Sequence, residues 1–406
     1  MKEVTKLFLD YVKFDTQSDE NSTTYPSTSK QLELLKHLKE TLIEWGLDAK
    51  MDEWGYVTAT LPTNQAGEQP KVCLIAHVDT SPAVSGKDVK ARIVEYHGGD
   101  VVLNEDPRYV LSREEFPALD RYVGKHLIVT DGTTLLGADD KAGVAEIMAA
   151  VRHLLLNPSI PRPTVKIAFT PDEEVGSGVA HFDVESFGAD FGYTVDGGEI
   201  GEINYECFNA ASALVKIKGV SIHPGDAYGK MINAVDVFCE FHQGLPLEER
   251  PATTKGYQGF YMADEVQGNL EELSAKYIIR DHDLAKLQAK KDYILSLAER
   301  INDRYGKKVV EVTLRDQYRN MRAKLEDGHM DLVQNAQKAF ESMGVTPFVT
   351  PIRGGTDGAS LTQRGLPCPN LSAGGHNFHG RYEYIPLESL ETMVDVLLAL
   401  LGNFVK

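Results

Sequence analysis

The sequence predicts an α/β fold in which a mixed sheet flanked by helices forms a discontinuous main domain, and a ferredoxin-like α+β domain is inserted in it. Apolar, strand-like runs alternate with helical patterns in the first half of the chain, which is typical of an α/β layer. After about Phe208 strands and helices follow one another as β-α-β-α-β, and after about Met321 the first pattern returns. The chain of 406 residues also exceeds what one compact core usually holds.

These patterns place the domain boundaries. We predict a main domain formed by residues 1–207 and 321–406, and an inserted domain formed by residues 208–320. The sequence contains no internal repeat and no low-complexity segment that would argue for another organisation.

The main domain is predicted to begin with two helices. Apolar residues between Val4 and Phe14 fall on one helical face. A second helix follows Ser27 or Ser29 as N-cap and runs to Trp45, before a glycine. The other expected elements are strands at 56–61 and 72–79, a mostly irregular stretch at 81–127, a helix at 141–156, strands at 164–176 and 191–198, a helix at 329–342, a loop at 351–361, a turn at 370–380 and a helix at 387–401.

The inserted domain has a pattern of its own. Its strands show the alternation of apolar and polar residues that indicates one buried and one exposed face. The expected elements are a strand at 211–225, a helix at 233–241, a strand at 274–281, a helix at 283–305 and a strand at 308–318. This order predicts a small sandwich of helices on a sheet.

Composition limits the classes of partner and the compartment. The formal charge of −18 argues against nucleic acid or an anionic membrane as the main partner. The N-terminus lacks the features of a signal peptide, and no stretch approaches the roughly 18 apolar residues of a membrane span. The four cysteines are scattered and form no CxxC pair, as expected for reduced thiols. We therefore expect a cytoplasmic protein.

Charged side chains end several of the apolar strands. His77 and Asp79 end the run at 72–79, and residues two apart on a strand point to one face. Each such residue alone has an ordinary interpretation: a core histidine, a solvated loop acid or a helix cap. Solvation does not explain why several apolar strands end in a carboxylate or an imidazole. The other members of the set are Glu173 and Glu174 after a second strand, Asp196 in a third, Asp139 and Asp140 before a helix, and His379 in a Gly-rich turn.

This set of side chains predicts a metal site. Carboxylates and imidazoles together suit a borderline divalent ion such as zinc. Two histidines and three or more acids can hold two ions about 3.5–4 Å apart if one carboxylate bridges them. Asp79 would then accept the second ring N–H of His77 and fix its orientation.

The motifs around these residues resemble the M20 metallopeptidases, in the same order and over nearly the whole chain. Within that family the sequence is more similar to the tripeptide aminopeptidases than to the carboxypeptidase, aminoacylase or succinyl-diaminopimelate desuccinylase branches. The motifs shared with the family are HVDT (77–80), LGADDKAG (136–143), TPDEEVG (170–176), VDGG (195–198), SIHPG (221–225), RGGTDGA (353–359) and NFHG (377–380).

The resemblance implies two Zn²⁺ ions per subunit, with Co²⁺ or Mn²⁺ able to serve in vitro. By analogy with the family, His77 and Asp196 would bind one ion and Glu174 and His379 the other. Asp139 would bridge the two ions.

The resemblance also implies the catalytic roles. Asp139 is preferred over Asp140 as the bridge because the family's bridging acid stands two residues before the Lys of DDK, and the peptide bond between the two aspartates is expected to be cis. Glu173 would be the general base that takes a proton from a water shared by the two metals. Asp79 would assist by orienting His77.

A third catalytic candidate lies in the inserted domain. The resemblance assigns His223 to the stabilisation of the oxyanion, in the active site of a partner subunit. The inserted domain would then act as a lid and dimerisation domain, with an exposed edge strand as the physical means of pairing. From the residues alone, His223 is a surface histidine beside a turn formed by Pro224 and Gly225.

Short peptides carry charged ends that need partners. Arg280 and Arg353 are candidates for the substrate carboxylate because a guanidinium matches that group, although an ordinary structural ion pair is the more common role of an arginine. Asn233 is a weaker candidate for a substrate contact from the lid. Asp357 could receive the free amino terminus, or could simply form a turn before a glycine.

We therefore expect a dizinc aminopeptidase that removes the N-terminal residue from tripeptides, acts on short peptides, and functions as a homodimer. The alternative within the family is a dipeptidase, a carboxypeptidase or an N-acyl-amino-acid deacylase, since the metal residues are common to all of these. A non-catalytic metal-binding protein is disfavoured because Glu173 accompanies every proposed ligand.

Overall fold

The computed structural model describes residues 1–406 and divides into two compact units. The first unit contains Met1–Tyr205, Ala323–Thr350 and Thr356–Lys406, and the second contains Glu206–Arg322 and Pro351–Gly355. Pro351–Gly355 were predicted to lie in the main domain, whereas the structure places these residues in the second unit.

Hydrogen bonds explain why this short segment belongs to the second unit. The Ile352 N–H donates to the Glu206 carbonyl at 3.0 Å. The Arg353 guanidinium donates to the carbonyls of Gly256 at 2.7 Å and Gln258 at 2.8 Å. These partners are distant in sequence, so local periodicity carried no sign of them.

An eight-stranded mixed sheet forms the centre of the first unit, in the order β1-β2-β8-β3-β9-β16-β10-β15. The pairs β8–β3, β3–β9 and β9–β16 are parallel, whereas β1–β2, β2–β8 and β16–β10 are antiparallel. The predicted mixed sheet is thus confirmed. The strands are β1 (Lys50–Met51), β2 (Val57–Leu61), β3 (Lys71–His77), β8 (Thr164–Thr170), β9 (Phe191–Gly197), β10 (Glu202–Asn204), β15 (Phe348–Val349) and β16 (Asn370–Ser372).

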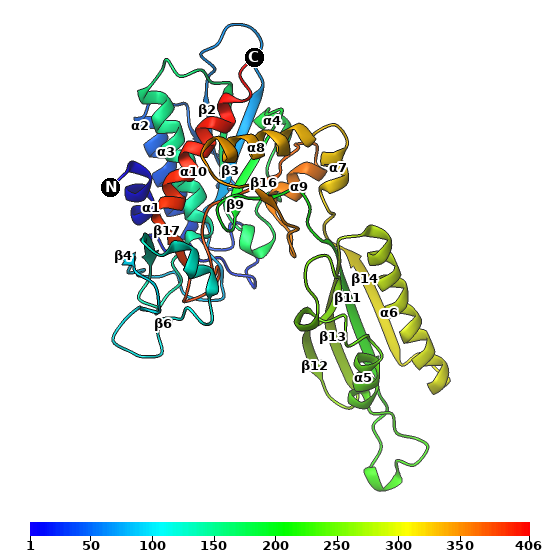
Figure 1. The fold of residues 1–406 in the computed structure, drawn as a ribbon. Helices are drawn as coiled ribbons and strands as arrows, with labels where there is room; N and C mark the ends of the chain where they lie inside the picture. Colours follow the sequence, from blue (N-terminus) through cyan, green and yellow to red (C-terminus); the bar gives the residue numbers. More distant parts are fainter. The chain divides into compact units, whose positions relative to one another are not determined.

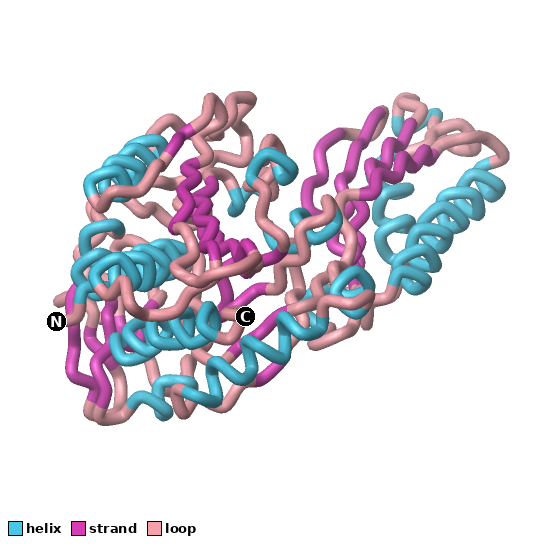
Figure 2. Tube along the Cα trace, turned by 90° about the horizontal axis from the view of Figure 1, so that it is seen from above, coloured by secondary structure: helices cyan, strands magenta, loops and turns pink.

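Helices cover both faces of this sheet (Figures 1 and 2). Helices α1, α3 and α10 pack on one another, and α3 lies directly on β3 and β9. On the other face, α4 and α9 contribute apolar side chains to a cluster that includes Cys73 and Ile75 of β3. Apart from the two helices of the second unit, the α-helices are α1 (Glu3–Tyr11), α2 (Gln31–Glu44), α3 (Ala138–Leu156), α4 (Val184–Phe187), α7 (Arg322–Glu326), α8 (Met330–Ser342), α9 (Asp357–Gln363) and α10 (Leu387–Gly402).

The stretch 81–127, predicted as mostly loop, contains regular structure. Strands β4 (Arg92–Tyr96) and β7 (Lys125–Val129) pair antiparallel, and β17 (Tyr384–Pro386) joins β7 from the far end of the chain. Strands β5 (Val101–Val102) and β6 (Val110–Leu111) form a hairpin beside the short helical turn η1 (Pro117–Tyr122). The stretch is still mostly irregular, as predicted, but these elements were not expected because the strands are short and one of their partners lies more than 200 residues away in the sequence.

Two smaller predictions about loops were wrong in part. The stretch predicted as the loop 351–361 contains the start of α9, which Thr356 caps by accepting the Gly358 N–H. The predicted turn at 370–380 begins with strand β16, which is buried along its whole length. Glycines in both stretches masked these elements in the sequence.

The second unit has the ferredoxin-like order β-α-β-β-α-β, with the sheet order β12-β13-β11-β14. All three strand pairs are antiparallel. Strand β12 was not predicted, because only one of its nine residues is buried and it shows little apolar alternation. The elements are β11 (Asn209–Lys218), α5 (Ala234–Gln243), β12 (Phe260–Gly268), β13 (Glu272–Asp281), α6 (Leu284–Tyr305) and β14 (Val310–Asp316).

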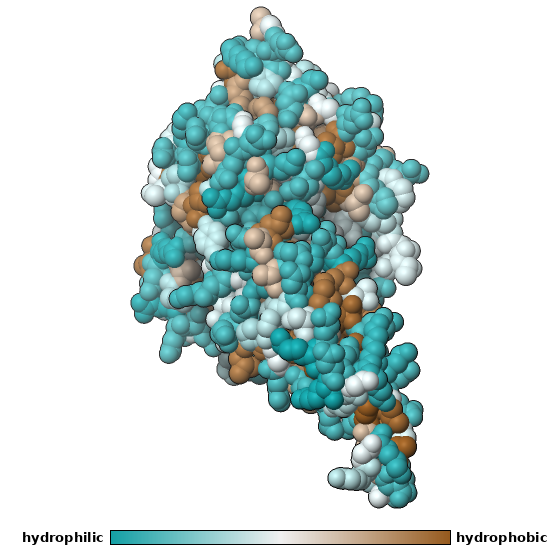
Figure 3. All heavy atoms as spheres, turned by 90° about the vertical axis from the view of Figure 1, so that its right-hand side faces the viewer, coloured by the Kyte–Doolittle hydropathy of each residue, from teal (hydrophilic) through white to brown (hydrophobic).

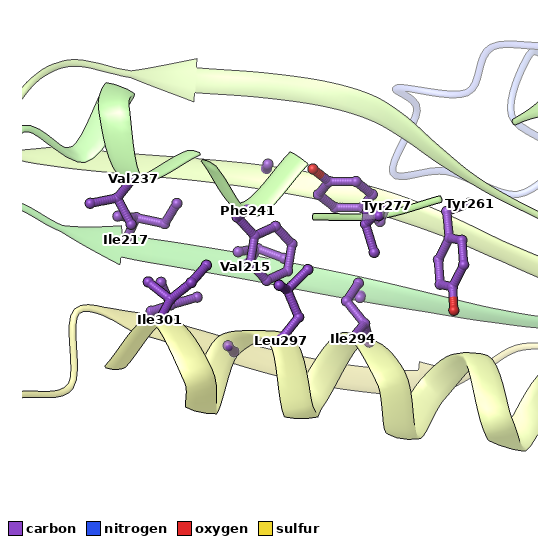
Figure 4. Packing of buried hydrophobic residues seen from close by; sticks show 14 of the residues in the cluster. Val215, Ile217, Val237, Phe241, Tyr261, Tyr277, Ile294, Leu297 and Ile301 are labelled. Carbon is purple, nitrogen blue, oxygen red and sulfur yellow. The ribbon is translucent and has the colours of Figure 1, made fainter. Parts of the chain in front are cut away.

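The core of the second unit lies between the two helices and one face of its sheet. Figure 4 shows Phe241 of α5 beside Val215 of β11 and Leu297 of α6. Tyr261 and Tyr277 fill the same cluster from β12 and β13. Every member of this cluster is an apolar or aromatic residue.

The surface is mainly polar. The face in Figure 3 is mainly hydrophilic, and its hydrophobic areas are small and separated by polar side chains. No helix is both long and apolar enough to cross a membrane. Cys239 is exposed, whereas the other three cysteines are buried.

Candidate metal centre

Three parallel strands deliver the candidate ligands to one edge of the central sheet. His77 is the last residue of β3, Glu173 and Glu174 follow the end of β8, and Asp196 lies near the end of β9. Because β8, β3 and β9 are adjacent and parallel, their carboxyl ends meet at the same edge. Two further residues reach this edge from outside the sheet: Asp139, at the start of α3, and His379, in the segment between β16 and β17.

The side chains form two groups that share Asp139. In the first group, His77 Nε2 lies 3.0 Å from Asp139 Oδ1 and 3.3 Å from Asp196 Oδ1. In the second, His379 Nε2 lies 3.0 Å from Asp139 Oδ2 and 2.9 Å from Glu174 Oε2. Each oxygen of Asp139 therefore faces a different histidine, which is the arrangement of a bridging carboxylate.

The neighbouring Asp140 has a different environment. Its Oδ2 accepts the His77 N–H at 3.2 Å, and its Oδ1 accepts the Gly143 N–H at 3.2 Å. Both oxygens are therefore engaged with backbone groups. The peptide bond between Asp139 and Asp140 is cis, as the resemblance predicted.

Asp79 connects two of the ligand-bearing strands. Its Oδ1 lies 3.2 Å from His77 Nδ1, which leaves Nε2 facing Asp139 and Asp196. The same carboxylate accepts the N–H of Glu173 at 3.0 Å and that of Glu174 at 3.2 Å. Asp79 is fully buried, so these bonds are shielded from water. One side chain thus orients an imidazole and fixes the backbone of both glutamates.

The pKa values of the acids show a concentration of negative charge. Burial, reinforced by neighbouring carboxylates, raises the pKa of Glu174 to about 7 and that of Asp196 to about 6. Burial and the charge of Asp196 also raise the pKa of Glu173 well above its ordinary value.

The histidines respond in the opposite sense. Hydrogen bonds with Asp139 and Glu174 raise the pKa of His379 to about 11. Burial alone would lower the pKa of His77, but the charge of Asp196 and hydrogen bonds with the aspartates raise it. Burial alone would raise the pKa of Asp139, and the two histidines lower it instead. The carboxylates of the cluster therefore favour positive charge beside them, and a bound cation would supply that charge.

The residues present fit a pair of divalent metal ions. Glu174 Oε1 is buried and has no hydrogen-bond partner in the protein, so this oxygen needs a further positive group. Carboxylate and imidazole donors without cysteine are those of open, catalytic zinc sites. His77, Asp139 and Asp196 would hold one ion, and Asp139, Glu174 and His379 would hold the other.

Comparison with known proteins identifies the family. Residues 131–403 match the peptidase family M20/M25/M40. The chain belongs to this family. It is 53% identical over 408 residues to Peptidase T of Caldanaerobacter subterraneus subsp. tengcongensis, with 100% of both chains covered. It is 52% identical over 403 residues to Peptidase T of Desulfitobacterium hafniense, covering 99% of this chain and 98% of the relative. The prediction of a peptidase of the M20 family is thus confirmed.

Solved structures agree with the fold. The aminopeptidase PepT of Bacillus cereus superposes with a TM-score of 0.77 at 24% identity, over 100% of this chain and 98% of that one. A dinuclear metal-binding peptidase of the M20 family from Bacillus subtilis superposes with a TM-score of 0.67 at 14% identity, over 99% and 97% of the two chains.

The predicted substrate residues of this M20 peptidase lie in the second unit, and most have structural partners. Arg280 Nη1 donates to the carbonyls of Ala211 at 3.1 Å and Ile279 at 3.0 Å, and its guanidinium lies over the Tyr318 ring. Asn233 caps α5 by accepting the Val235 N–H at 3.0 Å.

The other two candidates in the second unit differ in exposure and bonding. His223 is exposed and directly precedes the short helical turn Pro224–Asp226, where its Nδ1 accepts the Gly225 N–H at 3.2 Å. Arg353 uses three N–H groups, two on backbone carbonyls and one on Thr254 Oγ1. A guanidinium has five donors, so two remain.

Asp357 lies in the first unit, at the start of α9. It is buried and accepts the Thr170 hydroxyl at 3.1 Å. Burial raises the pKa of Asp357 to about 7, and the nearby charge of Asp196 acts in the same direction. Asp357 therefore lies within the same buried, negatively charged environment as the candidate ligands.

Sequence reasoning missed two buried carboxylates at the same sheet edge. Asp172, with φ of 59°, accepts hydrogen bonds from the Ser27 N–H at 2.5 Å and the Gln31 side chain at 2.7 Å. Glu383 accepts three backbone N–H groups from the turn that precedes Asp139. The only signal in the sequence was that Asp172 and Glu383 stand one and four residues from predicted site residues.

Proposed function

We propose that this M20 peptidase is a dizinc aminopeptidase that releases the N-terminal residue of tripeptides. The observation that carries the proposal is the pair of ligand groups joined through Asp139, with Glu173 next to a ligand of the second group. The relatives named Peptidase T, at 50–53% identity over the full chain, support the substrate class.

The metal ions have a defined place in this proposal. Two zinc ions held by these groups would lower the pKa of a water between them and polarise the peptide carbonyl. The protein supplies the other requirements. Asp79 keeps His77 Nε2 directed at the site, and Asp139 presents one oxygen to each group.

Glu173 would act as the general base and then as the general acid. Asp79 fixes its backbone through the N–H, and burial raises the pKa of its carboxyl group. A carboxylate with a raised pKa can accept a proton from the attacking water and deliver it to the leaving amine near neutral pH. Glu174, one residue away, differs because it faces His379 at 2.9 Å and serves as a ligand.

The second unit would contribute substrate recognition. Arg353 retains two donors for a substrate carboxylate, and Arg280 and Asn233 lie in the same unit. His223 would stabilise the oxyanion in a partner subunit, as the resemblance implies, and the exposed edge strand β12 is the proposed means of pairing. Lid and dimerisation roles for this unit, and a cytoplasmic location, complete the proposal.

The proposal is tested by a product assay. Zinc-loaded protein is incubated with Ala-Ala-Ala, Ala-Ala, Ala-Ala-Ala-Ala and N-acetyl-Ala-Ala-Ala, and the fragments are identified by mass. We expect free N-terminal Ala plus dipeptide from the tripeptide alone. Cleavage of the acetylated peptide or of the dipeptide instead would assign the chain to another activity of the family.

Variants of two glutamates make this assay specific. Glu173→Gln should lower kcat by about 10²–10⁴-fold while two zinc ions remain bound. Glu185→Gln, which changes an exposed glutamate on α4, is the control and should leave kcat unchanged. Equal activity of the two variants would exclude Glu173 as the base.

Recognition of the substrate carboxylate has a separate test. Arg353→Lys should raise KM for Ala-Ala-Ala but not for its C-terminal amide, because only the first has a carboxylate to pair. An equal rise for both peptides would mean that Arg353 only supports the loop around Gly256.

A further inference from the structure

Glu383 connects the end of the chain to the turn that carries Asp139. It stands directly before β17 and is only 2% exposed. Its Oε2 accepts the N–H of Leu136 at 2.7 Å and that of Gly137 at 2.8 Å, and its Oε1 accepts the Asp139 N–H at 3.1 Å. A buried carboxylate thus bonds three backbone N–H groups within four residues of the chain.

The turn depends on this acceptor. Gly137 has φ of 82°, a left-handed backbone conformation that favours glycine, two residues before Asp139. Without Glu383, three buried N–H groups would lose the acceptor that they share. A buried donor without a partner is costly, so the turn would move toward another arrangement.

The segment that carries Glu383 also carries His379. Residues His376 and Tyr384 exchange backbone hydrogen bonds at 2.9 and 3.1 Å, which closes the segment between them. Inside it, Asn377 donates to the Tyr382 carbonyl at 3.0 Å. His379, with φ of 62°, projects from this closed segment. Its position relative to Glu383 is therefore fixed.

Two attachments thus join this segment to Asp139. The Asp139 side chain lies 3.0 Å from His379 Nε2, and its backbone N–H lies 3.1 Å from the Glu383 carboxylate. The first attachment sets the distance between two candidate ligands, and the second sets the direction from which Asp139 enters the site.

We propose that Glu383 is a positioning residue of the metal centre, which holds the turn 136–139 so that Asp139 can face both ligand groups. It would contact neither the metals nor the substrate. Groups that orient metal ligands in this way typically change metal affinity by about 10–100-fold when they are replaced. The inference rests on the metal centre of the proposed function but not on the tripeptide substrate.

The test replaces the carboxylate by an amide of nearly the same shape. In Glu383→Gln, one oxygen becomes an NH₂ group, so at least one of the three N–H groups faces a donor. The control is Glu388→Gln, because Glu388 also accepts a backbone N–H, that of His126 at 3.1 Å, but is far less buried and bonds no residue of the turn.

The readouts do not require a peptide. We expect Glu383→Gln to raise the zinc dissociation constant, measured by competition with a chromophoric chelator, by about 10–100-fold. We also expect altered visible absorption bands after loading with Co²⁺, because these bands report the geometry of the ligands. Glu388→Gln should match the wild-type protein in both measurements.

The unfolding midpoint of the metal-free proteins separates positioning from folding. A Glu383→Gln variant that folds, binds zinc like the wild type and gives the same Co²⁺ spectrum would overturn the proposal. If that variant does not fold, Glu383→Asp, which keeps the charge and shortens the side chain by one methylene, is measured with the same two outcomes. Wild-type protein that binds two zinc ions but leaves tripeptides intact would refute the proposed substrate and not this role.

Discussion

Both units of the molecule bury charged side chains, such as Asp281 and Lys290 in the second unit, but they differ in where buried carboxylates gather. In the first unit, carboxylates such as Asp79, Asp140 and Glu383 are almost completely buried at one edge of the central sheet. Each accepts backbone N–H groups, and these bonds compensate for the loss of water. In the second unit the core cluster consists of apolar and aromatic residues alone (Figure 4). The first arrangement specifies chemistry, and the second supplies stability.

Two strands show the physical origin of this difference. Every residue of β3 after Lys71 is buried, because helices cover both faces of the central sheet. In β13 burial alternates, because α5 and α6 cover only one face. Polar side chains of the second sheet can point into solvent from its open face. In β3 no face is open, so a polar side chain is accommodated only at the end of the strand. The end of β3 is where His77 lies.

The largest expected effect concerns stability of the second unit. Phe241→Ala should destabilise this unit by about 3–5 kcal/mol, because a fully buried aromatic side chain leaves a cavity. Val235→Ala, at a 39% exposed position on the same helix, is the control. The measurement is hydrogen exchange in β11 and β13. Weaker zinc binding by the Phe241 variant would contradict the separation between the two units.

The next effect concerns the metal centre. Asp79→Asn should weaken zinc binding by about 10–100-fold. The Asp79 carboxylate orients the His77 ring and accepts the N–H groups of both glutamates, and an amide in its place carries no charge. Asp48→Asn, at an exposed position, is the matched control. Zinc titration of both variants would measure the effect, and equal affinities would show that Asp79 does not orient the ligands.

The pH dependence of stability distinguishes a buried carboxyl group that has hydrogen-bond partners from one that has none. Both carboxylate oxygens of Glu146 on α3 are buried and unpartnered, and burial raises the pKa of this group above its ordinary 4.5. The folded protein keeps a proton that the unfolded chain releases above that pH. This contribution to stability therefore declines as pH rises, by up to about 1.4 kcal/mol per pH unit, until the folded pKa is reached.

Glu146→Gln cannot ionise and should remove this slope. The difference in unfolding free energy between the variant and the wild type should grow in favour of the variant as pH rises from 5 to 8. Urea unfolding at several pH values would measure it. A difference that stays constant with pH would show that Glu146 does not carry this proton.

The smallest effect concerns a helix cap. Asn233→Ala should lower the stability of the second unit by about 1 kcal/mol, because α5 loses the acceptor of the Val235 N–H. Asn233→Ser should retain most of that stability, since serine is also a good N-cap. If Asn233 in addition contacts substrate, both variants would raise KM for the tripeptide. An unchanged KM would leave Asn233 with the cap alone.

Much of the fold could be predicted from periodicity. The long helices α3, α6, α8 and α10 and the strands β3 and β9 carry strong apolar patterns, and the structure places them close to the predicted ranges. The exceptions are short or exposed strands. Strand β12 has too few buried residues to show a pattern, and β17 is three residues long and pairs with β7, more than 250 residues earlier. Local sequence carries little information about such pairings.

The sequence by itself determined the chemical type of the site. Apolar strands that end in His77 and Asp196, together with the acids after β8, indicate a metal centre because buried charges need partners of opposite charge. Tertiary structure alone decided how these groups are held. It turned Asp139 toward both histidines and Asp140 toward backbone N–H groups, although the two are adjacent.

Tertiary structure also brought Glu383 to the turn before Asp139 and tied Arg353 to the second unit. The physical reason is the same in each case. Residue type and spacing determine which side chains can be buried, but the partner of a buried polar group is set by distances in the folded chain. Arg353 and its partner Gly256 are more than 90 positions apart in the sequence, and Glu383 and its partner Asp139 are more than 240 positions apart.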